Sequence, residues 1–188
     1  MNAPKGNHVT NFTVPGIKTS QADEIIGILE ERMVATIDLQ LTLKHVHWNV
    51  VGPNFISVHE MLDPQVDAVR EMTDTVAERI ASLGGVPVGT PGSVAERRDW
   101  QDYSLGKATV SEHLGALDVV YAGINSDHRA AIGRLSKLDP VSEDILIGHL
   151  AQLEQFQWFV RAHLESSGGE LPTADIRRER DAAKAAIS

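Results

Sequence analysis

Two histidines and three carboxylates lie at helical spacing in the first half of a chain that has no cysteine. These residues are His47, His59, Asp63, Asp74 and Glu78. Imidazole and carboxylate ligands suit iron, zinc or manganese, whereas soft thiolate sites would need cysteine. A single helical histidine or acidic pair is usually a packed or solvated side chain. The metal hypothesis therefore depends on how all five residues are spaced.

The spacing divides four of these residues into two pairs that one helix cannot bring together. His59 and Asp63 are four residues apart, as are Asp74 and Glu78, so each pair shares a helical face. The pair centres, at positions 61 and 76, lie 15 residues apart, which is roughly 22 Å along a helix. Metal–ligand bonds are only about 2 Å long. One chain alone is therefore predicted not to complete the site.

Two antiparallel copies of this helix would close the gap, because the first pair of one copy would then meet the second pair of the other. The twofold axis would pass near Ala68 or Val69, and the dimer would hold two equivalent sites. His47 belongs to the preceding helix, and the turn at 52–54 allows it to approach His59. The predicted site combines His47, His59 and Asp63 of one chain with Asp74 and Glu78 of its mate.

Simpler interpretations remain for two residues in this region. Asp63 precedes Pro64 and could be a turn or cap residue instead of a ligand. His45 is two residues from His47 and points elsewhere on a helix, so it is expected to pack in the core or to support a ligand.

Composition limits the class of protein. The chain has 188 residues, 42% of them hydrophobic, and a formal net charge of −9, which fits one globular domain with tails. Aromatic residues make up only 5%, which disfavours a β-sandwich or barrel. No apolar run approaches the roughly 18 residues of a membrane span, and the first residues lack the apolar core of a signal peptide. We therefore expect a cytoplasmic protein without membrane contact.

Apolar residues at helical spacing predict four long helices, and no alternating strand pattern competes with them. The helices are expected at residues 20–50, 54–83, 109–138 and 139–166. A connection rich in proline and glycine, residues 86–106, separates the second helix from the third and leaves room for a short helix at 93–99. Two helical hairpins joined by one long crossover form a ferritin-like four-helix bundle. The fold class is therefore all-α.

Helix ends and domain limits follow from local signals. Ser20 is the expected N-cap of the first helix, Thr109 with Glu112 forms a capping box, and Asp139 caps the fourth helix. Pro64 could kink or divide the second helix. The predicted organisation is an N-terminal arm at 1–19, a bundle at 20–167 and a C-terminal tail at 168–188.

Several motifs resemble the Dps family, the DNA-binding proteins from starved cells, in its actinobacterial form. They are LKHVHWN (43–49), GPNF (52–55), HEMLD (59–63), AER (77–79) and QWF (157–159). The resemblance implies a hollow homododecamer with ferroxidase sites at its twofold interfaces. It also implies oxidation of Fe(II) by hydrogen peroxide or oxygen and storage of a ferric mineral core, which protects DNA. The iron ligands that it implies are the five residues identified above.

Two further residues have roles that the resemblance implies less specifically. Asp127 is similar to the acids that line threefold iron-entry pores in the family, although a solvated helical aspartate is an equal alternative. Trp48 adjoins His47 and could intercept oxidising equivalents or simply pack at the dimer contact.

The expected contribution of DNA binding depends on the tail. Its basic residues are Arg177, Arg178, Arg180 and Lys184, and its acids are Glu170, Asp175, Glu179 and Asp181. This balance is typical of a solvated segment, yet many tails on one shell could add avidity for DNA without sequence preference. The alternative to an iron-oxidising store is therefore a nucleoid-packing shell whose metal sites are mainly structural, with a nucleoid-associated location.

Overall fold

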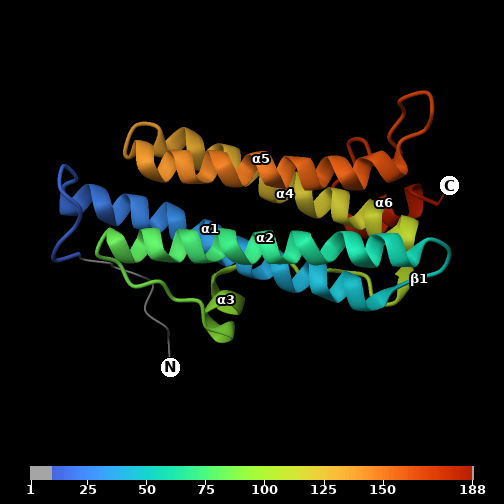
Figure 1. Cartoon of the computed structure of the whole chain (residues 1–188), viewed down its shortest axis with the longest axis horizontal. Helices are drawn as coiled ribbons and strands as arrows, with labels where there is room; N and C mark the ends of the chain where they lie inside the picture. Colours follow the sequence, from blue (N-terminus) through green and yellow to red (C-terminus); the bar gives the residue numbers. More distant parts are fainter. Residues whose placement is uncertain (1–9, 188) are drawn as a thin grey trace.

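The computed structural model describes residues 10–187 and shows a bundle of long helices. The long helices are α1 (Thr19–Asn49), α2 (Phe55–Ser82), α4 (Val110–Leu135) and α5 (Pro140–Leu164). The short helices are α3 (Pro91–Arg97) and α6 (Glu179–Ala185). The α1–α2 hairpin lies beside the α4–α5 hairpin along its whole length (Figure 1). The expected all-α ferritin-like bundle is confirmed.

Apolar side chains from all four long helices form the core in two clusters along the bundle. One cluster includes Leu43, Leu62 and Phe156 together with fully buried Tyr121. The other lies toward the opposite end and combines residues such as Ile25, Ile80, Leu135 and Leu146. Helices this long are stable mainly through such packing of their apolar faces.

The long connection between α2 and α4 carries the chain to the opposite end of the bundle. It contains α3 and ends at β2 (Ala108–Thr109), which pairs in parallel with β1 (Val50–Val51). Parallel pairing needs a crossover of this kind, since a tight turn can join only antiparallel strands. The connection therefore returns beside the loop that joins α1 to α2.

The helix ends confirm two of the three predicted caps. Thr109 and Glu112 form the capping box, and Asp139 accepts hydrogen bonds from the first turn of α5. The prediction for Ser20 is wrong, because α1 begins one residue earlier and its N-cap, Lys18, makes no side-chain cap bond. Pro64 lies inside α2, which continues through it as one helix. The ends of α4 and α5 fall two or three residues before the predicted limits.

The C-terminal segment packs against the bundle. Ala182 and Ala183 of α6 are buried against α4, and Gly115 of α4 leaves the space that this approach needs. Further upstream, the buried Thr173 hydroxyl donates a hydrogen bond of 2.6 Å to Asp118. Residues 1–9 of the expected N-terminal arm, which include Lys5, lie outside the described part of the chain. Within residues 10–187, no helix is long and apolar enough to cross a membrane.

Candidate metal centre

His47 and His59 face each other where α1 ends and α2 begins. Their rings stack with centroids 3.6 Å apart. Each ring Nδ1 lies 2.9 Å from the other residue's backbone carbonyl oxygen. Because a carbonyl can only accept a hydrogen bond, both Nδ1 atoms carry the proton, which leaves the Nε2 lone pairs for a metal. The arrangement thus selects the tautomer that a metal-binding histidine needs.

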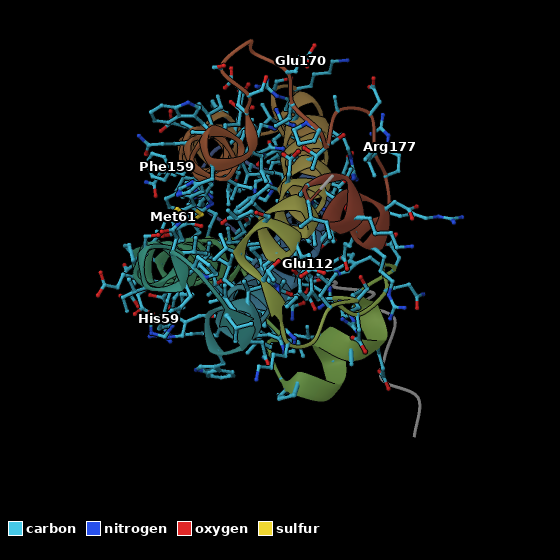
Figure 2. The ribbon with its side chains drawn as sticks, turned by 90° about the vertical axis from the view of Figure 1, so that its right-hand side faces the viewer. His59, Met61, Glu112, Phe159, Glu170 and Arg177 are labelled. Atoms are coloured by element: carbon cyan, nitrogen blue, oxygen red, sulfur yellow. The ribbon has the colours of Figure 1, made fainter. Side chains whose placement is uncertain are left out.

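The turn between the two helices produces this pairing. Gly52 has φ of 94° and Asn54 has φ of 63°, both in the left-handed region that glycine and asparagine adopt most readily. The chain reverses within residues 50–54, so the last turn of α1 meets the first turn of α2. His59 lies on the outer side of this hairpin, away from α4 and α5 (Figure 2).

Asp63 lies one turn after His59, and an ion pair with Lys44 holds its carboxylate. Lys44 Nζ is 2.5 Å from Asp63 Oδ1, and His47 Nδ1 is 3.3 Å from the same oxygen. The hydrogen bond from Lys44 lowers the pKa of Asp63 below its ordinary value, and the nearby His47 lowers it further. Asp63 is therefore ionised, and it lies beside Nδ1 of His47. Lys44 itself was not singled out by the sequence.

Asp74 and Glu78 are both exposed on α2, beyond the middle of the same helix. Since α2 is continuous from Phe55 to Ser82, the separation of roughly 22 Å from the first pair holds. Across residues 10–187, no three histidine or acidic side chains gather in a way that could hold a metal ion. The structure pairs His47 with His59 and places Asp63 near Nδ1 of His47, but these three do not converge on one point, and Asp74 and Glu78 lie farther along α2.

Large apolar side chains are exposed around the histidine pair. Trp48 is 72% exposed, Ile56 51% and Phe55 44%. The ring of Phe55 also contacts His59 edge-on, with centroids 6.2 Å apart. Exposed apolar residues that gather in one place commonly mark a protein–protein contact. The surface around the candidate ligands thus has the character of an interface.

Known proteins resemble this chain along most of its length. The family model described as Ferritin-like domain matches residues 26–167. The DNA protection during starvation protein of Mycolicibacterium smegmatis is 54% identical over 175 residues, covering 93% of this chain and 96% of that protein. The chain belongs to the Dps family of ferritin-like proteins.

Solved Dps structures agree with this assignment. DpsA14 from Streptomyces coelicolor is 62% identical, with a TM-score of 0.86, and the match covers 87% of this chain and 97% of that one. Mycobacterium smegmatis Dps in a tetragonal form has a TM-score of 0.85 and 57% identity, covering 86% and 98% of the two chains. The high identity to these two structures supports the actinobacterial type of Dps.

Other predicted residues lie elsewhere on this Dps-family chain. Asp127 is exposed on α4 and faces Arg32, with Nη1 and Oδ2 3.7 Å apart. His45 is half-buried, and its Nε2 donates to the carbonyl of Leu105 at 2.8 Å, so it secures the long connection. In the tail, Arg177 is exposed (Figure 2).

Of the remaining basic residues in the tail, Arg178 and Lys184 are exposed as well. Arg180 is also exposed, and its guanidinium donates to the carbonyl of Ser104 at 3.3 Å. The four bases therefore belong to a segment that is anchored to the bundle.

Proposed function

We propose that this protein oxidises Fe(II) at sites shared between two chains and stores the Fe(III) product inside a hollow homododecamer. The observation that carries the proposal is the stacked histidine pair, in which both Nδ1 atoms bond backbone carbonyls and both Nε2 lone pairs remain available for a metal, with the Asp63 carboxylate 3.3 Å from Nδ1 of His47. Asp74 and Glu78 on the same continuous helix are the complementary set, and an antiparallel copy of α2 would bring them to this position.

The residue types fit oxidation of iron. Neutral imidazoles from His47 and His59 suit Fe(II), while carboxylates from Asp63, Asp74 and Glu78 favour the harder Fe(III) ion. Two Fe(II) ions give up two electrons, which together with two protons convert one hydrogen peroxide to two waters. Because both electrons are available at one place, hydroxyl radical need not form. This chemistry would protect DNA from iron and peroxide, and oxygen is the alternative oxidant.

Lys44 has a defined part in this proposal. Its ammonium neutralises Asp63 at 2.5 Å while no iron is bound. Fe(II) would replace that ammonium as the counter-charge of the same carboxylate. Lys44 therefore keeps the site stable without iron, at the expense of some affinity for the ion.

Assembly and charge support iron storage. The net charge of −9 is repeated in every copy, and acidic channels concentrate cations. We place Asp127 in the iron-entry path because it resembles the acids of the family's threefold pores and is exposed on α4. The exposed apolar residues around His47 supply the surface that a second copy would bury.

Anaerobic titration with Fe(II), followed by stoichiometric peroxide, tests the proposal through the absorbance of Fe(III). Glu78→Gln should slow the fast phase at least about tenfold, because it removes one anionic ligand. Glu71→Gln is the matched control, since Glu71 is exposed on the same helix and outside the ligand set. Equal rates for the two variants would contradict the proposed site.

DNA binding is a second proposed function, and one observation favours it. Arg177 and Arg178 are exposed on a segment that Thr173 anchors to the bundle. In a symmetric shell, every copy would present these two arginines at an equivalent position. Several weak contacts with one DNA molecule would then raise the overall affinity. The 54% identical relative is named a DNA protection during starvation protein, and a cytoplasmic, nucleoid-associated location would follow.

Gel shifts at low and moderate salt test this function. The double variant Arg177→Gln with Arg178→Gln should weaken binding and reduce its dependence on salt, since each lost phosphate contact lowers the salt slope by about one unit. A variant ending at Ser167 should lose more. Unchanged binding by both variants would assign DNA binding to another part of the chain.

A further inference from the structure

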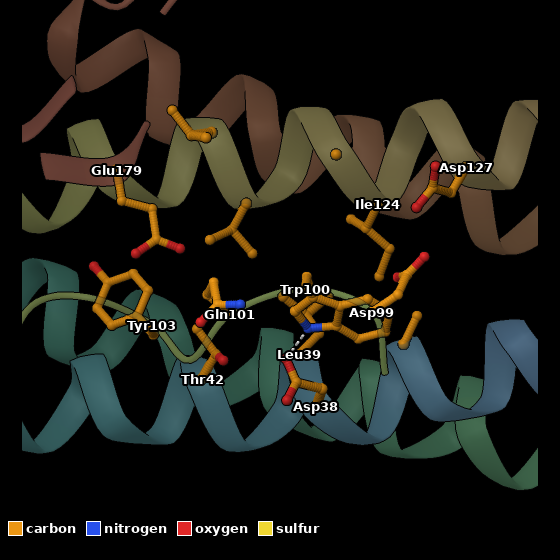
Figure 3. A pocket seen from close by; sticks show the side chains of 14 residues that line it. Asp38, Leu39, Thr42, Asp99, Trp100, Gln101, Tyr103, Ile124, Asp127 and Glu179 are labelled. Carbon is orange, nitrogen blue, oxygen red and sulfur yellow. Dashed lines mark hydrogen bonds between the residues drawn. The ribbon is translucent and has the colours of Figure 1, made fainter. Parts of the chain in front are cut away.

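A pocket of about 290 Å³ lies between α1, α4 and the connection that follows α3 (Figure 3). None of the five proposed iron ligands lines it. Its walls include apolar side chains of both helices, such as Leu39 and Ile124, and the aromatic rings of Trp100 and Tyr103. An apolar pocket with a few polar groups is the usual form of a small-molecule site.

The pocket lining is acidic. Its charged residues are Asp38, Asp99, Asp127 and Glu179, and no lysine, arginine or histidine lines it. Two of these acids, Asp38 and Asp127, form ion pairs with arginines that do not line the pocket. Arg98 Nη1 lies 3.0 Å from Asp38 Oδ1, and Arg32 Nη1 lies 3.7 Å from Asp127 Oδ2. The other two acids, Asp99 and Glu179, have no such direct arginine contact, and Arg32 acts on Asp99 only at longer range.

Asp99 and Glu179 form no ion pair with any residue between 10 and 187. They lie at opposite ends of the pocket, Glu179 beside Tyr103 and Asp99 toward Asp127 (Figure 3). One Glu179 oxygen accepts a hydrogen bond of 2.6 Å from the backbone N–H of Ser104, which fixes that carboxylate in place. A ligand that satisfies both acids must carry two positive charges separated by the length of the pocket.

The middle of the pocket suits a hydrocarbon chain. On α1 the lining runs over residues 35–42, which is roughly 10 Å of helix. The indole of Trp100 is held by its Nε1, which donates to Asp38 at 2.8 Å. Its ring face can therefore contact methylene groups and attract a nearby ammonium. Leu39 and Ile124 supply further apolar contact.

We propose that this pocket binds an aliphatic polyamine of about the length of spermidine. One terminal ammonium would contact Asp99 and the other would contact Glu179. The central secondary ammonium would lie over the Trp100 ring, which attracts cations, and the methylene groups would contact Leu39 and Ile124. A bare metal ion fits less well, because it needs several oxygen ligands that converge on one point and these acids lie at opposite ends of the pocket.

Binding would also stabilise the packing of the C-terminal helix α6 against the connection that follows α3. Glu179 is the first residue of α6, whereas Asp99 and Trp100 belong to the connection. A polyamine between them would add a link between these two segments. The ligand should therefore stabilise the docked position of α6 and of the basic residues that precede it.

Calorimetric titration of the iron-free assembled protein with spermidine, in buffer that contains Mg²⁺, tests the proposal. Saturation should occur at one spermidine per chain. Asp99→Asn should weaken binding roughly two- to fivefold, as expected for the loss of one ammonium contact with an exposed carboxylate. Glu96→Gln, an exposed acid on α3 outside the pocket, should leave the affinity unchanged. Equal losses for the two variants, or full displacement by Mg²⁺, would overturn the proposal.

Substitution of Glu179 tests the other end of the pocket. Glu179→Gln keeps an acceptor for Ser104 but removes the charge, and it should weaken spermidine binding as Asp99→Asn does. Asp181→Asn makes the same change of charge on α6 outside the pocket and should have no effect. Spermidine should also slow amide hydrogen exchange in residues 179–185 of the unsubstituted protein. Equal affinity of a monoamine of similar length, or unchanged exchange in α6 at saturating spermidine, would overturn the two-ended mode of binding.

Discussion

Gly115 is the point where the C-terminal helix comes closest to the bundle, and Gly115→Ala should release that helix. A Cβ atom at this position would lie 2.5 Å from the carbonyl oxygen of Ala182 and 2.9 Å from its carbonyl carbon. It would also lie 2.9 Å from Cβ of Ala186. Two of these atoms belong to the backbone, so no side-chain rotation can relieve the overlap. Helix α6 must therefore move away from α4.

The cost of that movement is small and local. Docking of α6 buries the methyl groups of Ala182 and Ala183, which is worth about 1–2 kcal/mol. Alanine in place of glycine within α4 stabilises the helix by roughly 1 kcal/mol. The two effects nearly cancel, so the free energy of unfolding of the bundle should change by less than about 1 kcal/mol. The docking equilibrium of α6 alone should shift by roughly tenfold or more.

Hydrogen exchange and limited proteolysis separate these two effects. In Gly115→Ala, amides of residues 182–187 should exchange as in an open chain, and trypsin should cleave after Arg178 and Arg180 at least about tenfold faster. Gly133→Ala is the matched control, because Gly133 lies in the same helix and no neighbouring atom lies within 4 Å of the place that a Cβ would take. Unchanged exchange and cleavage in Gly115→Ala would refute the docking of α6 described above.

Three further outcomes follow from single contacts. Thr173→Val removes the hydrogen bond to buried Asp118 and should lower the free energy of unfolding in urea by about 1–3 kcal/mol, whereas Thr173→Ser should retain most of it. Burial lowers the pKa of His149 to about 4 from an ordinary 6.5. The unfolded chain therefore binds more protons between these values, and the stability that is full above pH 6.5 should fall as the pH drops to 4, by at most about 1.4 kcal/mol per pH unit. His149→Gln should reduce this slope in urea unfolding series, and an identical slope would contradict the burial argument. Lys44→Gln removes the cation that competes for Asp63, so anaerobic calorimetry should show roughly two- to fivefold tighter Fe(II) binding; weaker binding would reverse the role given to Lys44.

The bundle could be predicted from sequence because its signals are local. Apolar periodicity located the four long helices, and the caps at Thr109 and Asp139 depend only on residues within the next turn. Ser20 carried the same kind of signal, yet α1 begins before it. Asp23, further along α1, accepts a hydrogen bond of 3.0 Å from the backbone N–H of Thr10.

Contacts between distant segments could not be predicted in the same way. The pairing of Lys44 with Asp63 depends on how the turn at 52–54 aligns two helices. The docking of α6 depends on small residues, since Gly115 and Ala182 give no periodic apolar signal. The relation between His59 and Asp63 was predictable because four residues make about one helical turn, and the proximity of His47 followed from the turn.

Subunit complementation tests the shared iron site most directly. His47→Ala and Asp74→Ala chains, each expected to be inactive alone, should be coexpressed and assembled together. Half of the randomly formed pairs would combine the two variants, and each such pair would hold one site with every ligand intact, so about one quarter of the sites should recover. The mixed assembly should regain about one quarter of the fast peroxide-dependent phase. No recovery in assemblies shown to contain both chains would contradict a site shared between subunits.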